Sequence, residues 1–258
     1  MIPYAATRGL FFYLSDNLKE RFNHSFGDLF ASYAVRLSAE TFGTQEVLTE
    51  EDERRLGWEG KTNDFTIVIE EDAILFECKT SALFHSAKKH ASLEEVRQDL
   101  KKTLASPRAK KGLFQLFEKI EAIKSRKLPE TLNQRYERVR NFYPVVLLYD
   151  QIRMANKAET FRNVLEAELN SAGIANFRFQ VWHVEELENL YDLVPKANIM
   201  ATVAKKFKND KYFAWDLNTL LYEETHKQHR YLCPFMFLPK GDTLAIKILR
   251  SLRDSENH

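Results

Sequence analysis

The sequence predicts an α/β protein built on a central mixed β-sheet with helices around it. Residues 64–79 form a predicted β-hairpin, because the apolar, β-branched-rich runs 65–69 and 73–76 flank a polar turn. The apolar runs 143–149 and 177–182 enclose a helical pattern that closes at Gly173. A β-α-β succession of this kind adds a parallel pair of strands, so the sheet is predicted to be mixed.

The N-terminal elements follow from apolar spacing. A helix is predicted over residues 18–42, ending at Gly43, with its apolar face formed by Phe22, Phe26, Leu29, Phe30, Tyr33, Ala34 and Leu37. A short strand is expected at 46–49, followed by the acidic run 50–53 and a loop. The hairpin runs are almost continuously apolar, which predicts strands covered on both faces.

Helices dominate the chain after the hairpin. A capping box at Ser92 predicts a helix toward Leu104, and Ser106-Pro107 interrupts the pattern. A second helix over 109–125 presents Leu113, Leu116, Phe117, Ile120 and Ile123 on one face. Further helices are predicted at 184–194, 197–207, 213–229 and 241–253. We therefore expect an α/β core over 1–195 and a helical C-terminal extension over 196–258 packed on it.

The composition indicates a soluble, cytoplasmic protein. Only two cysteines occur, Cys78 and Cys233, so no disulfide framework is expected and a reducing compartment is favoured. The N-terminus lacks a basic segment followed by a clean apolar stretch, which argues against a signal peptide. No apolar run approaches the roughly 20 residues that cross a bilayer, so no membrane association is expected.

Polar side chains converge on the predicted hairpin. With Glu71 and Asp72 as the two turn residues, Asp64 lies opposite Lys79, and Thr66 lies opposite Glu77. Opposed residues share a face and side chains repeat every two residues, so all four project to the same side of the sheet.

Two acids and a lysine on an otherwise apolar sheet require a chemical explanation, because burying unpaired charge is costly. Carboxylates from adjacent strands can hold Mg²⁺ (or Mn²⁺), which retains part of its water shell. A bound cation acidifies water and polarises a phosphodiester, while Lys79 can orient the attacking water. The alternative is structural: Asp64 and Lys79 form a cross-strand ion pair beside Glu77 at a sheet edge.

Asp64 followed thirteen residues later by Glu77-Cys78-Lys79 resembles the PD-(D/E)XK nuclease superfamily. This family includes restriction endonucleases, Holliday-junction resolvases and phage-defence effectors. The resemblance covers roughly residues 20–150 and implies a restriction-endonuclease-like, three-layer core. It implies that Asp64 and Glu77 bind the metal, that the Cys78 carbonyl completes its shell, and that Lys79 is catalytic. Relatives often carry a glutamine on the helix after the hairpin; Gln115 fits best and Gln98 is second.

The chain departs from the family pattern at two positions. Asn63 stands where the name-giving proline would be, and Ala31 occupies the place of a glutamate on the first helix. Three other acids are candidates for the missing carboxylate: Asp28, Glu40 and Glu50. The number of metal ions is left open.

The segment 79–140 is locally basic, with sixteen Lys or Arg against seven Asp or Glu, although the whole chain carries only +1. The basic residues nearest the site are Lys88, Lys89, Lys101, Lys102, Arg108, Lys110 and Lys111. A basic face beside a metal site suits a phosphate backbone; the alternative is an ordinary solvated helix surface.

The function expected from these observations is a metal-dependent nuclease, with DNA favoured over RNA as substrate. The resemblance also leaves open a phage-defence or mobile-element effector that acts with a second copy or a protein partner. The alternative from another class is a non-catalytic nucleic-acid-binding or assembly subunit that retains the nuclease fold.

Overall fold

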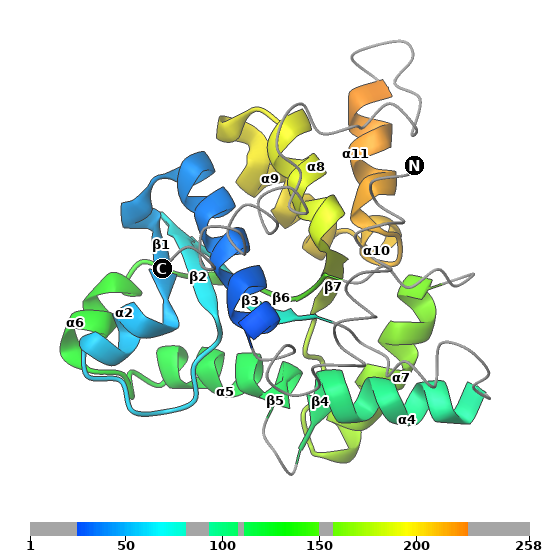
Figure 1. Ribbon diagram of the computed structural model, residues 1–258, viewed down its shortest axis with the longest axis horizontal. Helices are drawn as coiled ribbons and strands as arrows, with labels where there is room; N and C mark the ends of the chain where they lie inside the picture. The colour runs from blue at the N-terminus through cyan, green and yellow to red at the C-terminus, as the bar shows by residue number, and fades with distance from the viewer. Residues whose placement is uncertain (1–24, 81–92, 108–110, 150–156, 227–258) are drawn as a thin grey trace, which may run out of the picture.

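The predicted α/β class with a mixed sheet is confirmed by a computed structural model, which describes residues 25–80, 93–107, 111–149 and 157–226. Its five-stranded sheet has the order β1-β2-β3-β6-β7 (Figure 1). The strands are β1 (Val47–Thr49), β2 (Phe65–Ile69), β3 (Asp72–Lys79), β6 (Asn141–Leu148) and β7 (Gln180–His183). β1, β2 and β3 pair antiparallel, and β6 is parallel to β3. β7 is parallel to β6, as the β-α-β pattern predicts.

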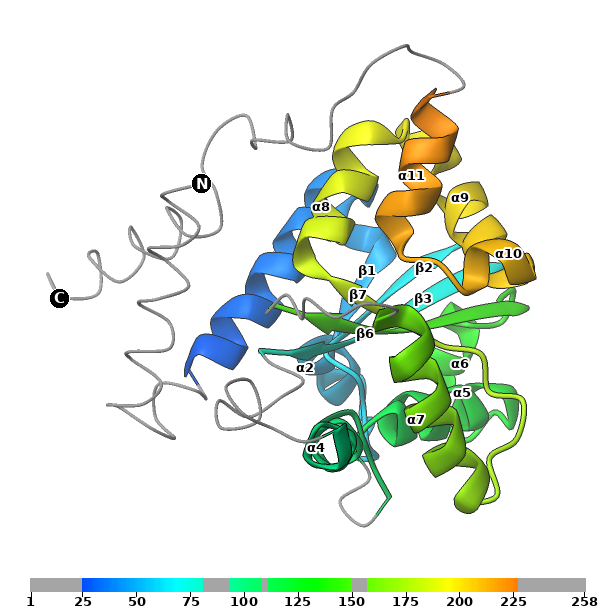
Figure 2. The ribbon, with the colours of Figure 1, turned by 90° about the vertical axis from the view of Figure 1, so that its right-hand side faces the viewer.

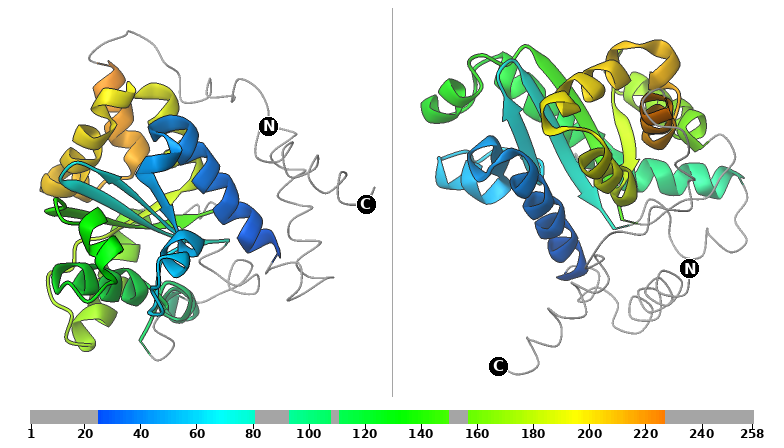
Figure 3. Two further views of the ribbon diagram at one scale, coloured as in Figure 1. Left: turned by 90° about the vertical axis from the view of Figure 1, so that its left-hand side faces the viewer. Right: turned by 90° about the horizontal axis from the view of Figure 1, so that it is seen from above.

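Helices cover both faces of the sheet, so the described residues form three layers (Figures 2 and 3). One face carries the helix over residues 25–42 together with α8 (Val184–Leu193), α9 (Lys196–Lys208), α10 (Asp210–Phe213) and α11 (Leu217–His226). The other face carries α4 (Leu93–Leu104), α5 (Leu113–Lys124), α6 (Glu130–Arg135) and α7 (Lys157–Ser171). The remaining short elements are η1 (Thr44–Glu46) and α2 (Glu50–Arg55), and β4 (Ala105–Ser106) and β5 (Lys111–Gly112), which pair as a separate two-stranded sheet.

Alternation along the hairpin divides its side chains between two cores. Phe65, Ile67, Ile74, Phe76 and Cys78 join the core under the helix over residues 25–42, whereas Val68, Ala73 and Leu75 join the core under α5. This burial on both faces is the one that the continuous apolar runs predict. The C-terminal helices contribute to the first core through Phe207, Leu217 and Leu221, but the domain boundary at residue 195 stays a prediction.

The hairpin register differs from the predicted one by two residues. The turn is formed by Glu70 and Glu71, with Glu70 in the left-handed region at φ 52°, and Ile69 pairs with Asp72. The prediction that Glu71 and Asp72 form the turn is therefore wrong, and Thr66 lies opposite Leu75. A shift of two residues preserves the alternation of side chains, so each side chain lies on the face of the sheet predicted for it.

Several element boundaries also differ from the predicted ones. The acidic run becomes helix α2, because Thr49 and Asp52 form a capping box at its start. The second helix after the hairpin begins at residue 113 instead of 109, since Gly112 at φ 64° belongs to β5. The predicted helix 213–229 begins too early, because Phe213 is the last residue of α10 and α11 begins at Leu217, where Asp216 accepts a 2.7 Å hydrogen bond from the Thr219 amide; residues 227–229 lie outside the described residues.

Some predicted features lie outside the described residues: the first turns of the helix over 18–42, the Ser92 cap, Cys233 and the helix over 241–253. Among the helices that the structure describes, none has the length and apolarity required to cross a membrane.

Candidate active site

Asp64, Glu77 and Lys79 come together where β3 ends beside the start of β2. The Lys79 ammonium donates to Glu77 Oε1 at 2.6 Å, and the Cys78 amide donates to Asp64 Oδ2, also at 2.6 Å. The Glu77 side chain is only 4% exposed, while that of Lys79 is 24% exposed. The predicted convergence of two carboxylates and an ammonium is therefore present. The Lys79 side chain is the more exposed member of the Glu77–Lys79 pair.

Burial raises the pKa of both acids in this cluster. Burial raises the pKa of Glu77 to about 8, since the nearby Lys79 charge offsets it only in part and Asp64 adds repulsion. Burial also raises the pKa of Asp64, against the opposing effects of Lys79 and the Cys78 amide. Burial alone would lower the pKa of Lys79, but the two carboxylates outweigh it and the net direction is upward.

One oxygen of the cluster lacks a counterpart. Glu77 Oε2 is buried and has no hydrogen-bond partner among the residues that the structure describes. A buried carboxylate oxygen left in this way is costly in a folded protein unless a proton or a cation occupies it. The donor set of Glu77 and Asp64 suits a hard divalent cation, so the residues present fit the metal that the sequence suggests.

The alternative of an ion pair at a sheet edge matches the structure in one respect only. An ion pair does form, but Lys79 pairs with Glu77 on its own strand. β3 is the middle strand of the sheet, between β2 and β6, rather than an edge strand. The Asp64–Lys79 pairing expected under that alternative is replaced by the bond from the Cys78 amide to Asp64.

Two acids outside the hairpin add negative charge to the site. Glu50 and Asp28 both contribute to raising the pKa of Asp64, and Glu50 also acts on Glu77. Glu50 begins α2, and its amide donates to the Asp64 carbonyl at 3.1 Å. Glu40, by contrast, is exposed and lies 3.9 Å from Arg36. Ala31 packs against the apolar core beside the sheet. Among the described residues, no group of three His, Cys, Asp or Glu side chains is arranged to hold a metal ion.

Of the two glutamine candidates, Gln115 lies near the site and Gln98 does not contact it. The Gln115 side-chain amide on α5 donates to the Thr62 carbonyl, two residues before Asp64. Gln98 instead donates to Glu94 at 2.7 Å on the exposed face of α4. Gln115 is therefore bonded to the backbone that leads to the site rather than to its acids.

A buried polar network beside the site is absent from the sequence-based prediction. Glu53 on α2 and Lys119 on α5 form an ion pair of 2.7 Å and are 1% and 0% exposed. The signal for it is present in the sequence, because Lys119 lies in the apolar stripe of Leu116, Ile120 and Ile123. A lysine on a buried helix face requires a partner, and the acidic run 50–53 supplies one.

The basic surface is described only in part. Lys88, Lys89, Arg108 and Lys110 lie outside the described residues, whereas Lys102 and Lys111 are exposed. Lys101 on α4 pairs with Glu168 on α7 at 3.1 Å. At least this member of the group therefore contributes to helix packing.

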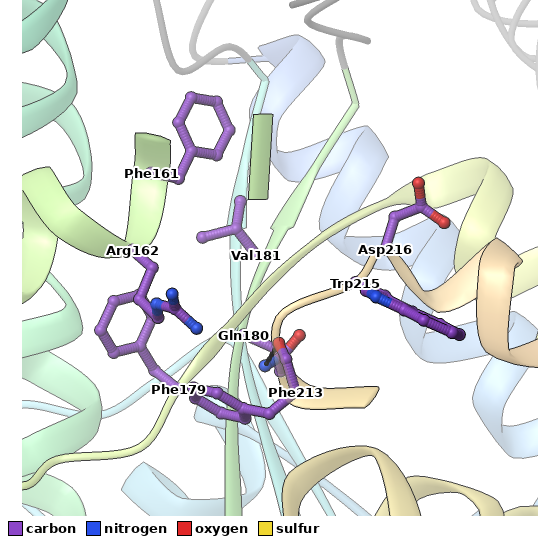
Figure 4. Close-up of a pocket in the computed structure, with 8 residues that line it drawn as sticks. All are labelled: Phe161, Arg162, Phe179, Gln180, Val181, Phe213, Trp215 and Asp216. Atoms are coloured by element: carbon purple, nitrogen blue, oxygen red, sulfur yellow. Dashed lines mark hydrogen bonds between the residues drawn. The ribbon is translucent and has the colours of Figure 1, made fainter. Parts of the chain in front are cut away.

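A small pocket lies apart from the hairpin, between α7, β7 and the segment that joins α10 to α11 (Figure 4). It is lined by Phe161, Arg162, Phe179, Gln180, Val181, Phe213, Trp215 and Asp216. Behind it the buried Lys206 donates to Gln180 Oε1 at 2.6 Å and to the carbonyls of Tyr212 and Trp215 at 2.7 and 2.9 Å. These bonds give Lys206 a role in fixing the end of α10.

Comparison of the chain with protein-family models and with curated proteins finds no match to either.

Proposed function

We propose that this chain is a nuclease that uses Mg²⁺ or Mn²⁺ to hydrolyse phosphodiester bonds in DNA, on a restriction-endonuclease-like core. The observation that carries the proposal is the buried, unpartnered Glu77 Oε2 beside Asp64 and Lys79. Most buried carboxylate oxygens in folded proteins have a hydrogen-bond donor, so this oxygen is a position where a proton or a cation would bind. Acidic and basic groups at the end of a central strand are arranged for chemistry on a charged substrate.

The chain's own residues divide the work. Asp64 and Glu77 would hold the cation, and the Cys78 carbonyl is a further oxygen ligand. The N–H and C=O of one strand residue point to the same side, and the Cys78 amide already points toward Asp64. When bound, the cation supplies an acidified water and polarises the phosphate. Lys79 keeps one N–H on Glu77 and has two more to orient that water or to offset charge on the phosphorane.

The substrate class rests on charge. A phosphodiester backbone is anionic, and the segment 79–140 carries an excess of basic residues beside the acids that would bind the metal. Lys102 and Lys111 are exposed members of this segment. Binding through them would be sensitive to salt and largely independent of sequence.

The test is a cleavage assay with plasmid and linear DNA in the presence of Mg²⁺ or Mn²⁺. Wild type should cleave and Lys79→Ala should lose about a hundredfold or more in rate, because an ammonium aimed at the reacting phosphate is removed. The matched control is Lys124→Ala, which removes an exposed lysine paired with Glu121 on α5 and should cleave normally. Equal cleavage by wild type and Lys79→Ala would assign the activity to a contaminant.

A second candidate function is a non-catalytic nucleic-acid-binding or assembly subunit. It is favoured by Ala31, which packs an apolar side chain where relatives of this pattern place a carboxylate. This function predicts that the protein retards DNA in a gel without cleaving it. It also predicts equal DNA binding by wild type and Glu77→Gln in the presence or absence of Mg²⁺.

A further inference from the structure

The buried Glu53–Lys119 pair contacts the segment 62–64, which ends at Asp64, through a hydrogen bond from Thr62 to Glu53. Lys119 Nζ is 2.7 Å from Glu53 Oε2, and it lies 5.2 Å and 5.6 Å from the ring centres of Trp58 and Tyr136. Burying two charges here costs free energy that apolar side chains of similar size would avoid. The pair therefore calls for a role beyond filling space.

Glu53 gathers donors from three separate elements. Besides Lys119 on α5, it accepts a 2.7 Å hydrogen bond from the Thr62 hydroxyl and a 2.9 Å hydrogen bond from the Tyr136 hydroxyl. A charged acceptor makes such bonds shorter and stronger than a neutral one would. The lysine places an opposite charge beside the carboxylate, and the carboxylate in turn accepts the hydrogen bond that orients the Thr62 side chain.

Hydrogen bonds fix both Thr62 and Asn63, the two residues that precede Asp64. The Thr62 carbonyl accepts from Gln115, and the Asn63 side-chain amide donates to the carbonyls of Phe65 and Phe76. Asn63 thus links β2 to β3 by hydrogen bonds. It stands at the position of the proline in the family pattern, whose ring would restrict the backbone there. Both residues are buried, at 2% and 1% exposed.

We propose that Glu53, Lys119 and Thr62 are positioning residues that fix the Asp64 carboxylate against β3. The inference rests on the proposed function, since Asp64 is placed there to hold the cation. None of the three contacts the reacting atoms; each acts through the backbone of residues 62–64. Supporting groups of this kind determine how well the groups that they orient bind a metal.

The Cys78 amide offers a reporter that requires neither metal nor substrate. Its bond to Asp64 Oδ2 exists only while that carboxylate is held in place. Hydrogen exchange of this amide, followed by NMR on the metal-free full chain, therefore reports how often its hydrogen bond to Asp64 opens. Thr62→Val removes the hydroxyl that reaches Glu53 while it leaves the ion pair intact, and Thr62→Ser restores the hydroxyl.

We expect exchange of the Cys78 amide to be about tenfold faster in Thr62→Val, as loss of one buried hydrogen bond implies. Thr62→Ser should exchange like wild type. Ser38→Ala is the matched control, because it removes a buried hydroxyl that lies 3.0 Å from the Tyr191 hydroxyl on the opposite face of the sheet. It should leave the Cys78 amide unchanged relative to amides in the middle of β3.

A second measurement tests whether the positioning residues Glu53, Lys119 and Thr62 affect metal binding. The dissociation constant for Mn²⁺ should rise about tenfold or more in Thr62→Val and stay at the wild-type value in Thr62→Ser. Unchanged Cys78 exchange in Thr62→Val, or equal acceleration in Ser38→Ala, would overturn the inference. If wild type neither binds Mn²⁺ nor cleaves DNA but the exchange rates are as expected, the proposed function is wrong. The positioning role of Glu53, Lys119 and Thr62 would then still hold.

Discussion

Removal of Lys119 alone should destabilise the protein more than removal of both members of its ion pair. In Lys119→Met the Glu53 carboxylate stays 1% exposed and keeps only two hydroxyl donors, from Thr62 and Tyr136. An uncompensated buried charge of this kind costs about 3–5 kcal/mol. For a chain of this size, that corresponds to a fall of roughly 6–20 °C in Tm.

The double variant Glu53→Leu/Lys119→Met separates the charge effect from lost packing. It removes both buried charges, and the Thr62 hydroxyl keeps the Asn63 carbonyl as an acceptor at 2.9 Å, so the lost hydrogen bonds cost about 1–3 kcal/mol. The free energy of unfolding should therefore be higher in the double variant than in Lys119→Met. Urea unfolding followed by circular dichroism measures all of these variants. Lys124→Met, an exposed position on the same helix, is the control and should stay within about 0.5 kcal/mol of wild type. Lys119→Met with a wild-type urea midpoint would refute the reasoning.

Three further predictions follow from the described contacts. The pKa of Glu77 lies at about 8 in the folded, metal-free protein, above its ordinary value of 4.5, so its contribution to stability is complete below 4.5 and is lost as the pH rises to about 8. Unfolding free energies measured across this range should fall by about 1.4 kcal/mol per pH unit from this group, and a Glu77→Gln protein with the same slope would contradict this. Mn²⁺ should bind more tightly as the pH rises through the same interval, because the ligand must lose its proton; calorimetry in two buffers would detect the released proton, and pH-independent affinity would argue against Glu77 as a ligand. Lys206→Met should lower the free energy of unfolding by about 2–4 kcal/mol, since it leaves the carbonyls of Tyr212 and Trp215 buried without their donor; a melting temperature equal to that of wild type would show that water or a neighbour replaces it.

The sequence predicts the architecture well where the signal is strong and local. The hairpin and the strand over 141–148 are long apolar runs with few alternatives, and both form in the central sheet. The parallel β6–β7 pair follows from the helix between its strands, because a parallel connection requires a crossover. Burial on both faces follows from the same continuous apolarity.

Details that depend on single turns or on distant partners are harder to predict. The turn is displaced to Glu70 and Glu71 because Glu70 accepts a left-handed backbone that composition does not reveal. The acidic run forms α2 because Thr49 and Asp52 form a capping box and acidic residues stabilise the first turn of a helix. This local signal is in the sequence, whereas the conformation of Glu70 is not evident from it.

The candidate site is predicted from alternation alone, and alternation is insensitive to a shift of two residues. Asp64, Glu77 and Lys79 therefore meet although the predicted pairing is wrong. The supporting network is not predicted because its members lie 66 residues apart, on α2 and α5. The apolar stripe around Lys119 indicates that this lysine requires a partner, but only tertiary packing selects Glu53 as that partner.

The most direct test of the account is a crystal of the wild-type protein soaked in Mn²⁺ and measured for anomalous scattering. We expect a Mn²⁺ peak within bonding distance of one oxygen of Asp64 and of Glu77 Oε2, the oxygen that has no hydrogen-bond partner in the described part of the chain. The same soak of Glu77→Gln crystals should show no peak there. A wild-type map without density between these two carboxylates, at a Mn²⁺ concentration that supports cleavage, would contradict the central claim.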